Sequence, residues 1–276
     1  MKFAVVDGNK IEASKGAKGF CQSCGAELIA KCGEFKINHW AHKKIRRCDR
    51  WWETETEWHR EWKGNFPIEW QEIIQFDSVT NEKHIADVRT DKGLVIEFQH
   101  SHINPIERRQ REDFYKNMIW IVDGTRLQRD IPRFIKAQKD FVPMENPSIF
   151  GIEFADECFP KNWLGSSVPV IIDFKETPLI GNKKSNRTLL YCIFPIQLGW
   201  LTVFAEISRK ALIKSIIDGE WQTRYASFMN DLAEQNKLKA QQAKLELERQ
   251  QMRSRYQFNQ LLLGRRFTGR RRRRRF

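Results

Sequence analysis

Apolar and polar residues alternate along two stretches in the middle of the chain, residues 83–89 and 94–101. A glycine-containing segment at 91–93 separates them, and a tight turn there would pair the two stretches as antiparallel strands. On the first strand Asp87 stands among apolar residues, where an ionised carboxylate is costly unless a cation compensates for its charge. Glu97 lies on the second strand. The pattern predicts an oxygen-rich site at Asp87 and Glu97, suited to Mg²⁺ or Mn²⁺.

A helical period replaces this alternation in the segment before the strands. Residues 50–66 place a stripe of Trp side chains on one face of a predicted helix. Glu55, His59 and Lys63 follow each other at intervals of four beside that stripe. Such a polar line predicts a helix that borders an active site, although a surface ladder of Glu, His and Lys is the alternative.

The next elements complete a mixed α/β pattern. Residues 68–77 predict a strand before the hairpin, and 118–124 form a continuous apolar run typical of a buried central strand. A helix is predicted over 105–117, with Arg108 and Arg111 near one face. These two Arg side chains are candidates for contacts with a phosphate backbone, and a solvated charged face is the alternative.

Beyond residue 140 the pattern predicts structure without any chemistry of its own. Three strands are expected at 168–174, 188–194 and 200–207, as a hairpin-based extension of the sheet, followed by a short helix at 208–219. Residues 221–263 predict a long helix whose apolar positions are too sparse to require a coiled coil, so it is a candidate contact for a partner protein or for dimerisation.

Composition adds a cellular setting and a basic end. The 276 residues are 41% hydrophobic, yet they contain no apolar run of membrane-spanning length and no signal-peptide core, so we expect a soluble cytoplasmic protein without a membrane contact. The net charge is +13, and eight of the Arg residues lie within 265–276. We expect this tail to be disordered until it meets a polyanion such as DNA.

Cysteine and histidine pairs suggest a separate metal site near the N-terminus. A short hairpin at 3–13 is followed by Cys21 and Cys24 on a glycine-containing turn, and then by His39 and His42. Two such pairs can close a tetrahedral zinc site, which would have no open position and would therefore be structural. Cys32 and Cys48 compete for places as ligands, and ordinary surface thiols and histidines are the alternative reading.

Several of these motifs together resemble the competence-protein CoiA-like nuclease family. Asp87 followed after nine residues by Glu97-Phe98-Gln99 is similar to the PD-(D/E)xK nuclease core, with Gln99 where Lys is more usual. The Cys pair, the His-Trp-Ala-His run and the Glu-Thr-x-Trp-His segment are similar to the same family over residues 15–125. The resemblance implies a restriction-endonuclease-like mixed sheet flanked by helices, with a zinc-ribbon-like module before it.

The resemblance also implies roles for individual residues. Asp87 and Glu97 would hold Mg²⁺, with support from a glutamate of the first helix, either Glu55 or Glu57, and with Gln99 positioning the nucleophile or contacting phosphate. Further candidates for contacts with the nucleic acid are His59, Lys63 and His84.

The expected organisation is a zinc module at 1–48, a nuclease core at 49–140, a β-rich extension at 141–220, and a long helix with its Arg-rich tail at 221–276. The expected function is metal-dependent hydrolysis of DNA, most simply as an endonuclease, in competence and recombination or in phage defence. The alternative is a catalytically inactive module that holds nucleic acid for a partner protein.

Overall fold

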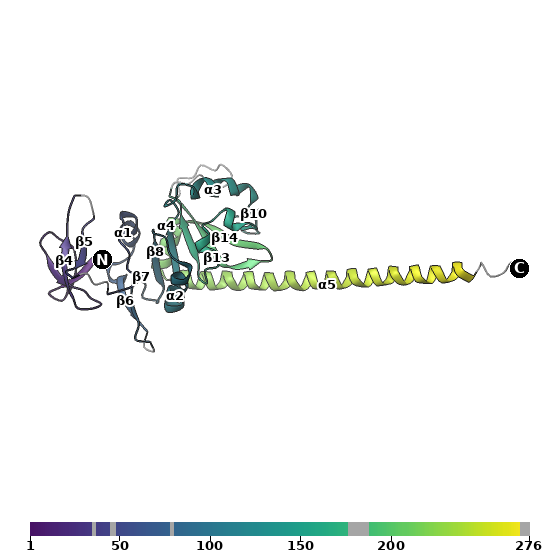
Figure 1. The fold of residues 1–276 in the computed structure, drawn as a ribbon, viewed down its shortest axis with the longest axis horizontal. Coiled ribbons are helices and arrows are strands. Elements are labelled where there is room, and N and C mark those ends of the chain that lie inside the picture. Colours follow the sequence, from purple (N-terminus) through teal and green to yellow (C-terminus); the bar gives the residue numbers. More distant parts are fainter. Residues whose placement is uncertain (35–36, 45–47, 78–79, 176–187, 271–276) are drawn as a thin grey trace. The chain divides into compact units, whose positions relative to one another are not determined.

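The fold is described from a computed structural model, over residues 1–34, 37–44, 48–77, 80–175 and 188–270, with side chains described up to residue 260. The chain divides into two compact units, Met1–Arg224 and Tyr225–Phe276. The first unit contains two β-sheets with helices around the larger one, so the protein is a mixed α/β structure (Figure 1).

A small sheet forms the N-terminal part of the first unit. Its five strands lie in the order β2-β1-β3-β4-β5 and are β1 (Phe3–Val6), β2 (Asn9–Glu12), β3 (Lys18–Phe20), β4 (Glu27–Lys31) and β5 (His39–His42). The predicted hairpin at 3–13 is confirmed, with Asp7 and Gly8 both at positive φ in its turn. Leu28 and Trp40 are buried between this sheet and its loops, which gives the module a small apolar core.

The large sheet has nine strands in the order β10-β11-β14-β13-β12-β9-β8-β7-β6. They are β6 (Gln71–Phe76), β7 (Lys83–Arg89), β8 (Val95–Gln99), β9 (Met118–Asp123), β10 (Val142–Pro143), β11 (Ile149–Ile152), β12 (Val170–Asp173), β13 (Leu189–Leu198) and β14 (Leu201–Ser208). The strands β8, β9 and β12 run parallel to one another, and the other neighbours are antiparallel.

The central strands are those with unbroken apolar sequence, as the hydrophobic pattern predicts. Every residue of β8 and of β9 is buried, because neighbouring elements cover both faces of the sheet. The predicted hairpin of β7 and β8 and the predicted strand at 118–124 are confirmed. The three strands predicted after residue 140 also form, and they extend the same sheet beyond β9.

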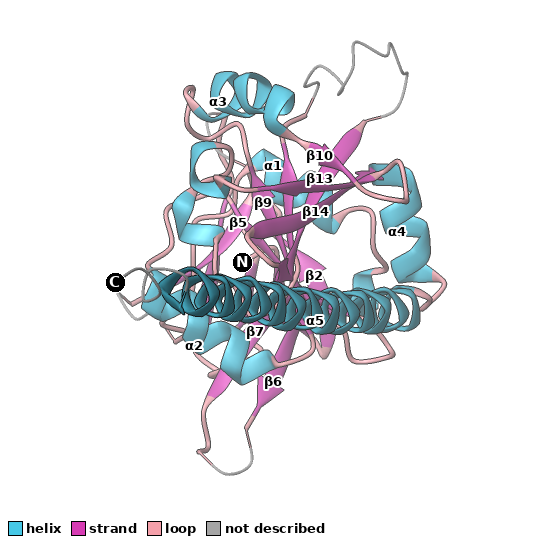
Figure 2. Ribbon diagram, turned by 90° about the vertical axis from the view of Figure 1, so that its right-hand side faces the viewer, coloured by secondary structure: helices cyan, strands magenta, loops and turns pink. Residues whose placement is uncertain are grey.

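Three helices of this unit are α1 (Glu57–Lys63), α2 (Pro105–Tyr115) and α4 (Arg209–Ile217), and α2 and α4 lie on either side of the strands (Figure 2). A further helix, α3 (Asp130–Ala137), packs Phe134 into the main core. The prediction of a helix over 50–66 was too long, because Thr56 accepts from the backbone N–H of His59 and so caps the helix there. Residues 50–55 are an extended loop instead.

The last helix, α5 (Trp221–Arg270), begins in the first unit and forms the described part of the second. The long helix predicted for 221–263 is confirmed, and the backbone stays helical through Arg270, whereas we expected a structureless segment from Arg265 onward. The rest of the predicted tail, 271–276, lies outside the described residues. Over the described ranges, no helix has both the length and the apolar character needed to cross a membrane.

Candidate functional site

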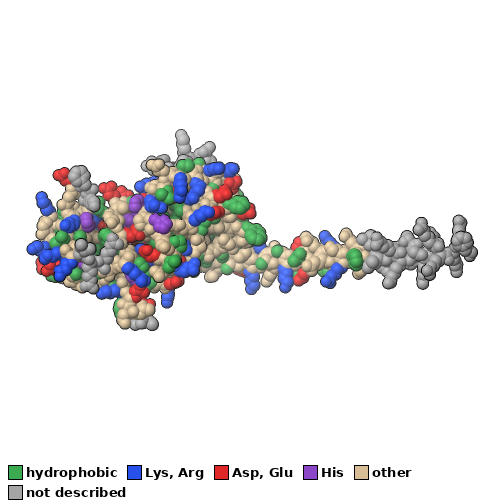
Figure 3. Space-filling view, in the orientation of Figure 1, with side chains coloured by type: hydrophobic (Ala, Val, Ile, Leu, Met, Phe, Trp, Pro, Cys, Tyr) green, Lys and Arg blue, Asp and Glu red, His purple; other side chains and the backbone are tan. Residues whose placement is uncertain are grey.

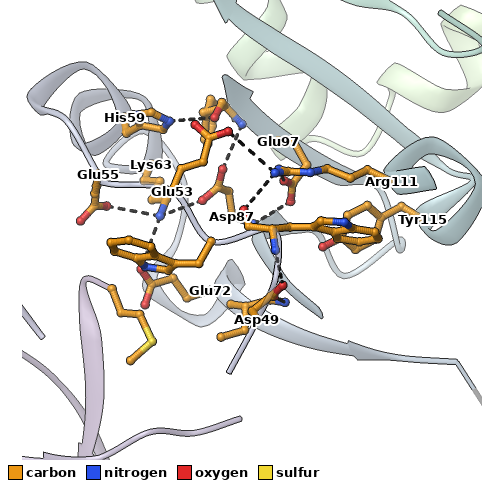
Figure 4. Close-up of a pocket in the computed structure, with 15 residues that line it drawn as sticks. Asp49, Glu53, Glu55, His59, Lys63, Glu72, Asp87, Glu97, Arg111 and Tyr115 are labelled. Atoms are coloured by element: carbon orange, nitrogen blue, oxygen red, sulfur yellow. Dashed lines mark hydrogen bonds and ion pairs between the residues drawn. The ribbon is translucent and has the colours of Figure 1, made fainter. Parts of the chain in front are cut away.

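An acidic pocket opens where the α1 helix meets the β7-β8 hairpin (Figure 4). Its carboxylates come from six residues, while two basic side chains, Lys63 and Arg111, also line it. The six are Asp49, Glu53, Glu55, Glu72, Asp87 and Glu97. The excess of carboxylates over cations makes the pocket a strongly negative cavity, in which a further cation would be stabilised.

Asp87 and Glu97, the two predicted metal ligands, meet across the β7-β8 pair. The backbone N–H of Asp87 donates to Oε1 of Glu97 at 3.1 Å, and the N–H of Phe98 donates to Oδ2 of Asp87 at 3.0 Å. Each carboxylate is therefore fixed by the backbone of the other strand. The register of the hairpin holds both acid groups at one point of the pocket.

Lys63 provides the positive charge at the centre of the pocket. Its ammonium lies 2.9 Å from Oδ1 of Asp87, 3.3 Å from Oε1 of Glu55 and 3.4 Å from Oε1 of Glu72 (Figure 4). Burial alone would lower the pKa of Lys63, but the three carboxylates, Asp87 first, outweigh burial and hold this pKa well above its ordinary value. Lys63 therefore stays charged and acts as an internal counter-ion.

Glu97 is protonated more readily than an ordinary glutamate. Burial, followed by the charge of Asp87, raises the pKa of Glu97 to about 8. The guanidinium of Arg111 lies 3.2 Å from Oε2 of Glu97 and acts in the opposite direction, but burial and Asp87 outweigh it. A cation bound beside Glu97 would favour the ionised form, which is the behaviour expected of a metal ligand.

Glu55 is the predicted acid that the structure places beside Lys63. Burial raises the pKa of Glu55, but the charge of Lys63 and the hydrogen bond and charge of Arg60 outweigh burial and lower this pKa to about 2. Arg60 donates to Oε2 of Glu55 at 2.7 Å. Glu57, the alternative, is exposed on the first turn of α1 and does not line the pocket.

His59 links α1 to the edge of the pocket. Its Nε2 lies 2.8 Å from the carbonyl oxygen of Phe98, and its Nδ1 lies 2.9 Å from Oγ1 of Thr56. Burial lowers the pKa of His59, so the neutral imidazole donates from Nε2. Both ring nitrogens of His59 are within hydrogen-bond distance of a partner, so His59 links α1 to β8.

Gln99 is buried and lies beside a carboxylate that we did not predict. Its Nε2 donates to Oε1 of Glu53, while its Oε1 is buried without a hydrogen-bond partner among the described residues. Glu53 also accepts from the hydroxyl of Ser101 at 2.9 Å. Glu53 was missed because the prediction started the helix at residue 50, whereas α1 begins at Glu57. The capping signal of Thr56 could have corrected that start.

Glu72 is a second acid that the sequence did not reveal. Its backbone has a positive φ of 49°, which is uncommon for a residue other than glycine. Its two carboxylate oxygens accept the backbone N–H groups of Lys2 at 2.7 Å and of Phe3 at 3.1 Å. Glu72 therefore ties strand β1 of the small sheet to Lys63 in the pocket.

All five predicted contacts with nucleic acid are buried in the structure, Arg108, Arg111 and His84 as well as His59 and Lys63. Arg108 donates to the carbonyl oxygens of Trp163 and Gly165, and Arg111 points into the pocket, where it also donates to the carbonyl oxygen of Trp51. His84 places its ring nitrogens 2.8 Å from Asp49 and 3.0 Å from Glu82. The prediction of an exposed Arg face on α2 was wrong, because α2 buries this polar face against the sheet and the loop after residue 163.

A second cluster, in the small sheet, gathers cysteine and histidine. Ligand atoms of Cys21, Cys24, His42 and Cys48 all lie within 4.8 Å of one another. His39, which we predicted as a ligand, is outside this group, with its Nδ1 3.0 Å from the carbonyl oxygen of Ile37. On the strand β5 positions 39 and 42 face opposite sides, so the two histidines cannot converge.

This donor set fits a structural metal. Three thiols and one imidazole are a common tetrahedral set for Zn²⁺. The hydrogen bond from Cys48, with further hydrogen bonds from the backbone of Cys24 and Ser23, lowers the pKa of Cys21 to about 4 despite burial. A thiolate is thereby available at Cys21, which is the form that binds a metal.

Comparison with known families supports the N-terminal part of this assignment. Residues 5–50 match the sequence model described as the competence protein CoiA, N-terminal domain. This match covers the small sheet and all four residues of the cysteine and histidine cluster, and it supports a CoiA-like family for the chain. The acidic pocket lies almost wholly outside the matched residues. Neither the curated proteins nor the solved structures contained a match.

Proposed function

We propose that the acidic pocket is the active site of a metal-dependent DNA nuclease with a restriction-endonuclease-like core. The observation that carries this proposal is the cross-bonded pair of Asp87 and Glu97, buried on adjacent strands in a cavity with six carboxylates. The short spacing of the two acids on a hairpin, together with the resemblance to the PD-(D/E)xK pattern, favours a phosphodiesterase over other metal enzymes.

The residues present fit a hard divalent cation such as Mg²⁺ or Mn²⁺. Carboxylate oxygens are the ligands that these ions prefer. Asp87 and Glu97 would hold the ion. Glu55 lies close to them, because Lys63 forms ion pairs with both Glu55 and Asp87. When bound, the ion would lower the pKa of a water molecule and stabilise charge on the phosphate. The donor set of the small sheet, by contrast, suits a structural zinc.

Lys63 and Gln99 have complementary tasks in this proposal. Gln99 carries no charge, so it cannot supply the ammonium that the usual motif places on the strand. Lys63 brings an ammonium to 2.9 Å from Asp87, from the helix instead of from the strand. Gln99 is buried beside Glu53, and its Oε1 has no hydrogen-bond partner among the described residues.

Cleavage of labelled circular, linear and single-stranded DNA tests this proposal. We expect cleavage of circular DNA with Mg²⁺ or Mn²⁺, none with EDTA, and a loss of at least about a hundredfold in Asp87→Asn and Glu97→Gln, because each removes a ligand charge. Asp91→Asn, in the exposed turn of the same hairpin, is the matched control and should cleave as the wild type does. Equal binding with no cleavage by any of these proteins would instead favour a non-hydrolytic nucleic-acid-binding module.

A further inference from the structure

The carboxyl ends of the three parallel strands form an edge of the sheet next to the acidic pocket. In this part of the sheet Gln99 pairs in register with Val122, and Asp123 pairs with Asp173. The strands β8, β9 and β12 therefore end side by side. In α/β sheets the carboxyl ends of parallel strands are a common place for ligands, because the chain turns away there and leaves polar groups free.

His100 follows β8 at this edge and is held by a buried carboxylate. Its Nδ1 lies 2.8 Å from Oδ2 of Asp123, whose side chain is only 2% exposed, while the side chain of His100 is 38% exposed. Oδ1 of Asp123 accepts from the hydroxyl of Thr125 at 2.6 Å. Asp123 thus fixes the ring through Nδ1, and Nε2 of His100 is left to face an incoming group.

Arg209 lies near the end of β12 in a similar arrangement. Its guanidinium stacks 4.0 Å from the ring centroid of Trp62 and lies 4.0 Å from Oδ2 of Asp173, which is fully buried. The same carboxylate oxygen accepts the indole N–H groups of Trp58 at 3.1 Å and Trp62 at 2.9 Å. Arg209 is therefore positioned by an aromatic face and a distant charge, and within the described ranges most of its five N–H donors have no hydrogen-bond acceptor, so they can meet an anion.

The two basic residues flank one aromatic pair, and His100 lies beside a residue of the acidic pocket. The ring of Trp58 lies 6.5 Å from that of His100 and 6.4 Å from that of Trp62, on which Arg209 stacks. On the other side, the ring of His100 lies 6.3 Å from that of His59, which lines the pocket. In Figure 3 histidine side chains lie close to several Lys and Arg side chains on the face shown.

We propose that His100 and Arg209 form a phosphate-binding ledge, a site for the sugar-phosphate backbone of a nucleic acid strand that enters the acidic pocket. This inference rests on the proposed nuclease function. Such a site is needed because Arg108, Arg111 and His84 are buried and already paired. With Nδ1–H donated to Asp123, the imidazolium form of His100 would donate from Nε2 to a phosphate oxygen, and the guanidinium fork of Arg209 suits phosphate geometry.

Binding of a labelled oligonucleotide in EDTA, followed by fluorescence anisotropy over a range of salt concentrations, tests the ledge without any cleavage. We expect His100→Gln and Arg209→Gln each to weaken binding roughly tenfold at low salt, the usual effect of losing a charge-assisted hydrogen bond. Arg209→Gln should also reduce the slope of log K against log salt by about one. The matched controls are His102→Gln, in the loop after β8, and Arg109→Gln, on α2; both residues are exposed, and their replacement should have much smaller effects.

The outcomes separate this proposal from the nuclease proposal. Weakened binding in the ledge variants, combined with a wild type that never cleaves, would keep the ledge and reject the nuclease. If the wild type cleaves normally and the ledge variants bind as the controls do, the ledge alone is rejected. A wild type that does not bind the oligonucleotide would also reject the ledge. If Arg209→Gln loses the near-ultraviolet circular dichroism of the native fold, two other variants decide. These are His100→Gln, at a partly exposed residue, and Arg209→Lys, which preserves the charge and should keep the wild-type salt slope.

Discussion

At the scale of single residues, the pocket is dominated by charges that compensate one another. Asp87 and Glu97 each accept one backbone N–H, and each faces one cation, Lys63 or Arg111. An ionised carboxylate is costly to bury unless it is paired, so this pairing offsets the cost of burying the two acids. It also means that any divalent cation would rearrange an existing network of ion pairs.

Glu97 gives this network a dependence on pH. With a pKa raised from 4.5 to about 8, folded Glu97 keeps a proton that the unfolded chain releases above pH 4.5. The folded state then binds more protons, so the free energy of unfolding falls as pH rises towards 8, by at most about 1.4 kcal/mol per pH unit. Glu97→Gln should remove this contribution, which urea unfolding in EDTA at pH 5 to 8 would measure. Equal slopes for the two proteins would show that Glu97 is already ionised.

Replacement of Lys63 tests whether a metal ion can take the place of its ammonium group. Lys63→Met leaves Asp87, Glu55 and Glu72 without their shared cation, and we expect a loss of stability of about 3–5 kcal/mol, as for other broken buried ion pairs. Because a divalent cation can take over this charge, Mg²⁺ should raise the melting temperature of the variant more than that of the wild type.

The control for this measurement is Lys43→Met, which removes an exposed ammonium paired with Glu27 on the small sheet. It should melt as the wild type does, with no added response to Mg²⁺, because an exposed ion pair contributes little. An equal response to Mg²⁺ in Lys63→Met and in the wild type would argue that the ion binds elsewhere.

Some members of the site could be predicted from the sequence, and the reason lies in short-range geometry. Asp87 and Glu97 sit on a hairpin, so strand alternation and one tight turn are enough to bring them together. Glu53 and Glu72 could not be found in this way. Glu53 depends on where α1 begins, and Glu72 depends on a positive φ and on contacts with strand β1.

At the scale of elements, the hydrophobic pattern located β1, β2, β6 to β9 and β12 to β14, but it missed the short strands β3 to β5, β10 and β11. It also did not decide which face of a helix is buried. The helix α2 forms close to the predicted range, yet its buried residues are Arg108, Arg111 and Glu112. Arg108 is buried because its terminal N–H groups donate to the carbonyl oxygens of residues 163 and 165 and because its guanidinium pairs with Glu112. Residues 163 and 165 lie in and just after a short 3-10 helix, a segment with no periodic signal. From the sequence alone, a buried polar side chain whose partner is distant in the chain cannot be distinguished from a polar side chain exposed to solvent.

The strand β5 leads to a prediction about the metal of the small sheet. Alternation along β5 separates His39 from His42, so the fourth place falls to Cys48. We expect one zinc per chain in the wild type and in His39→Asn, and loss of zinc in Cys48→Ser, measured by plasma mass spectrometry of the purified proteins. Cys32→Ser is a further control, since Cys32 lies outside the cluster.

Loss of zinc should also weaken the contacts that join the small sheet to the acidic pocket. The N–H groups of Lys2 and Phe3, on the same small sheet, are held by the carboxylate of Glu72, which contacts Lys63. A structural metal contributes directly to the folding of such a module, so Cys48→Ser should melt at a lower temperature. The opposite pattern, with zinc retained in Cys48→Ser and lost in His39→Asn, would favour the original assignment by spacing.

At the scale of the whole molecule, charge is distributed very unevenly along the chain. The net charge is +13, of which the eight Arg residues between 265 and 276 supply +8, leaving +5 for the rest. The proposed active site and ledge lie in the first unit, Met1–Arg224, and the Arg-rich end belongs to the second. Retention of a polyanion and its cleavage can therefore be measured separately.

Removal of residues 265–276 should weaken the binding of duplex DNA and leave the chemical step unchanged. Each neutralised phosphate contributes about 0.9 to the slope of log K against log salt, so the loss of eight Arg residues can lower that slope by up to about 7. The rate at saturating DNA should stay the same, because the carboxylates of the pocket are untouched, whereas the KM for DNA should rise. A tail in which every Arg is replaced by Lys keeps the charge and should behave as the wild type, and a Gly/Ser tail of equal length should behave as the deletion. If the Lys tail also failed, the end of the chain would bind through the specific geometry of the guanidinium group, and a counterion-release account of its role would be wrong.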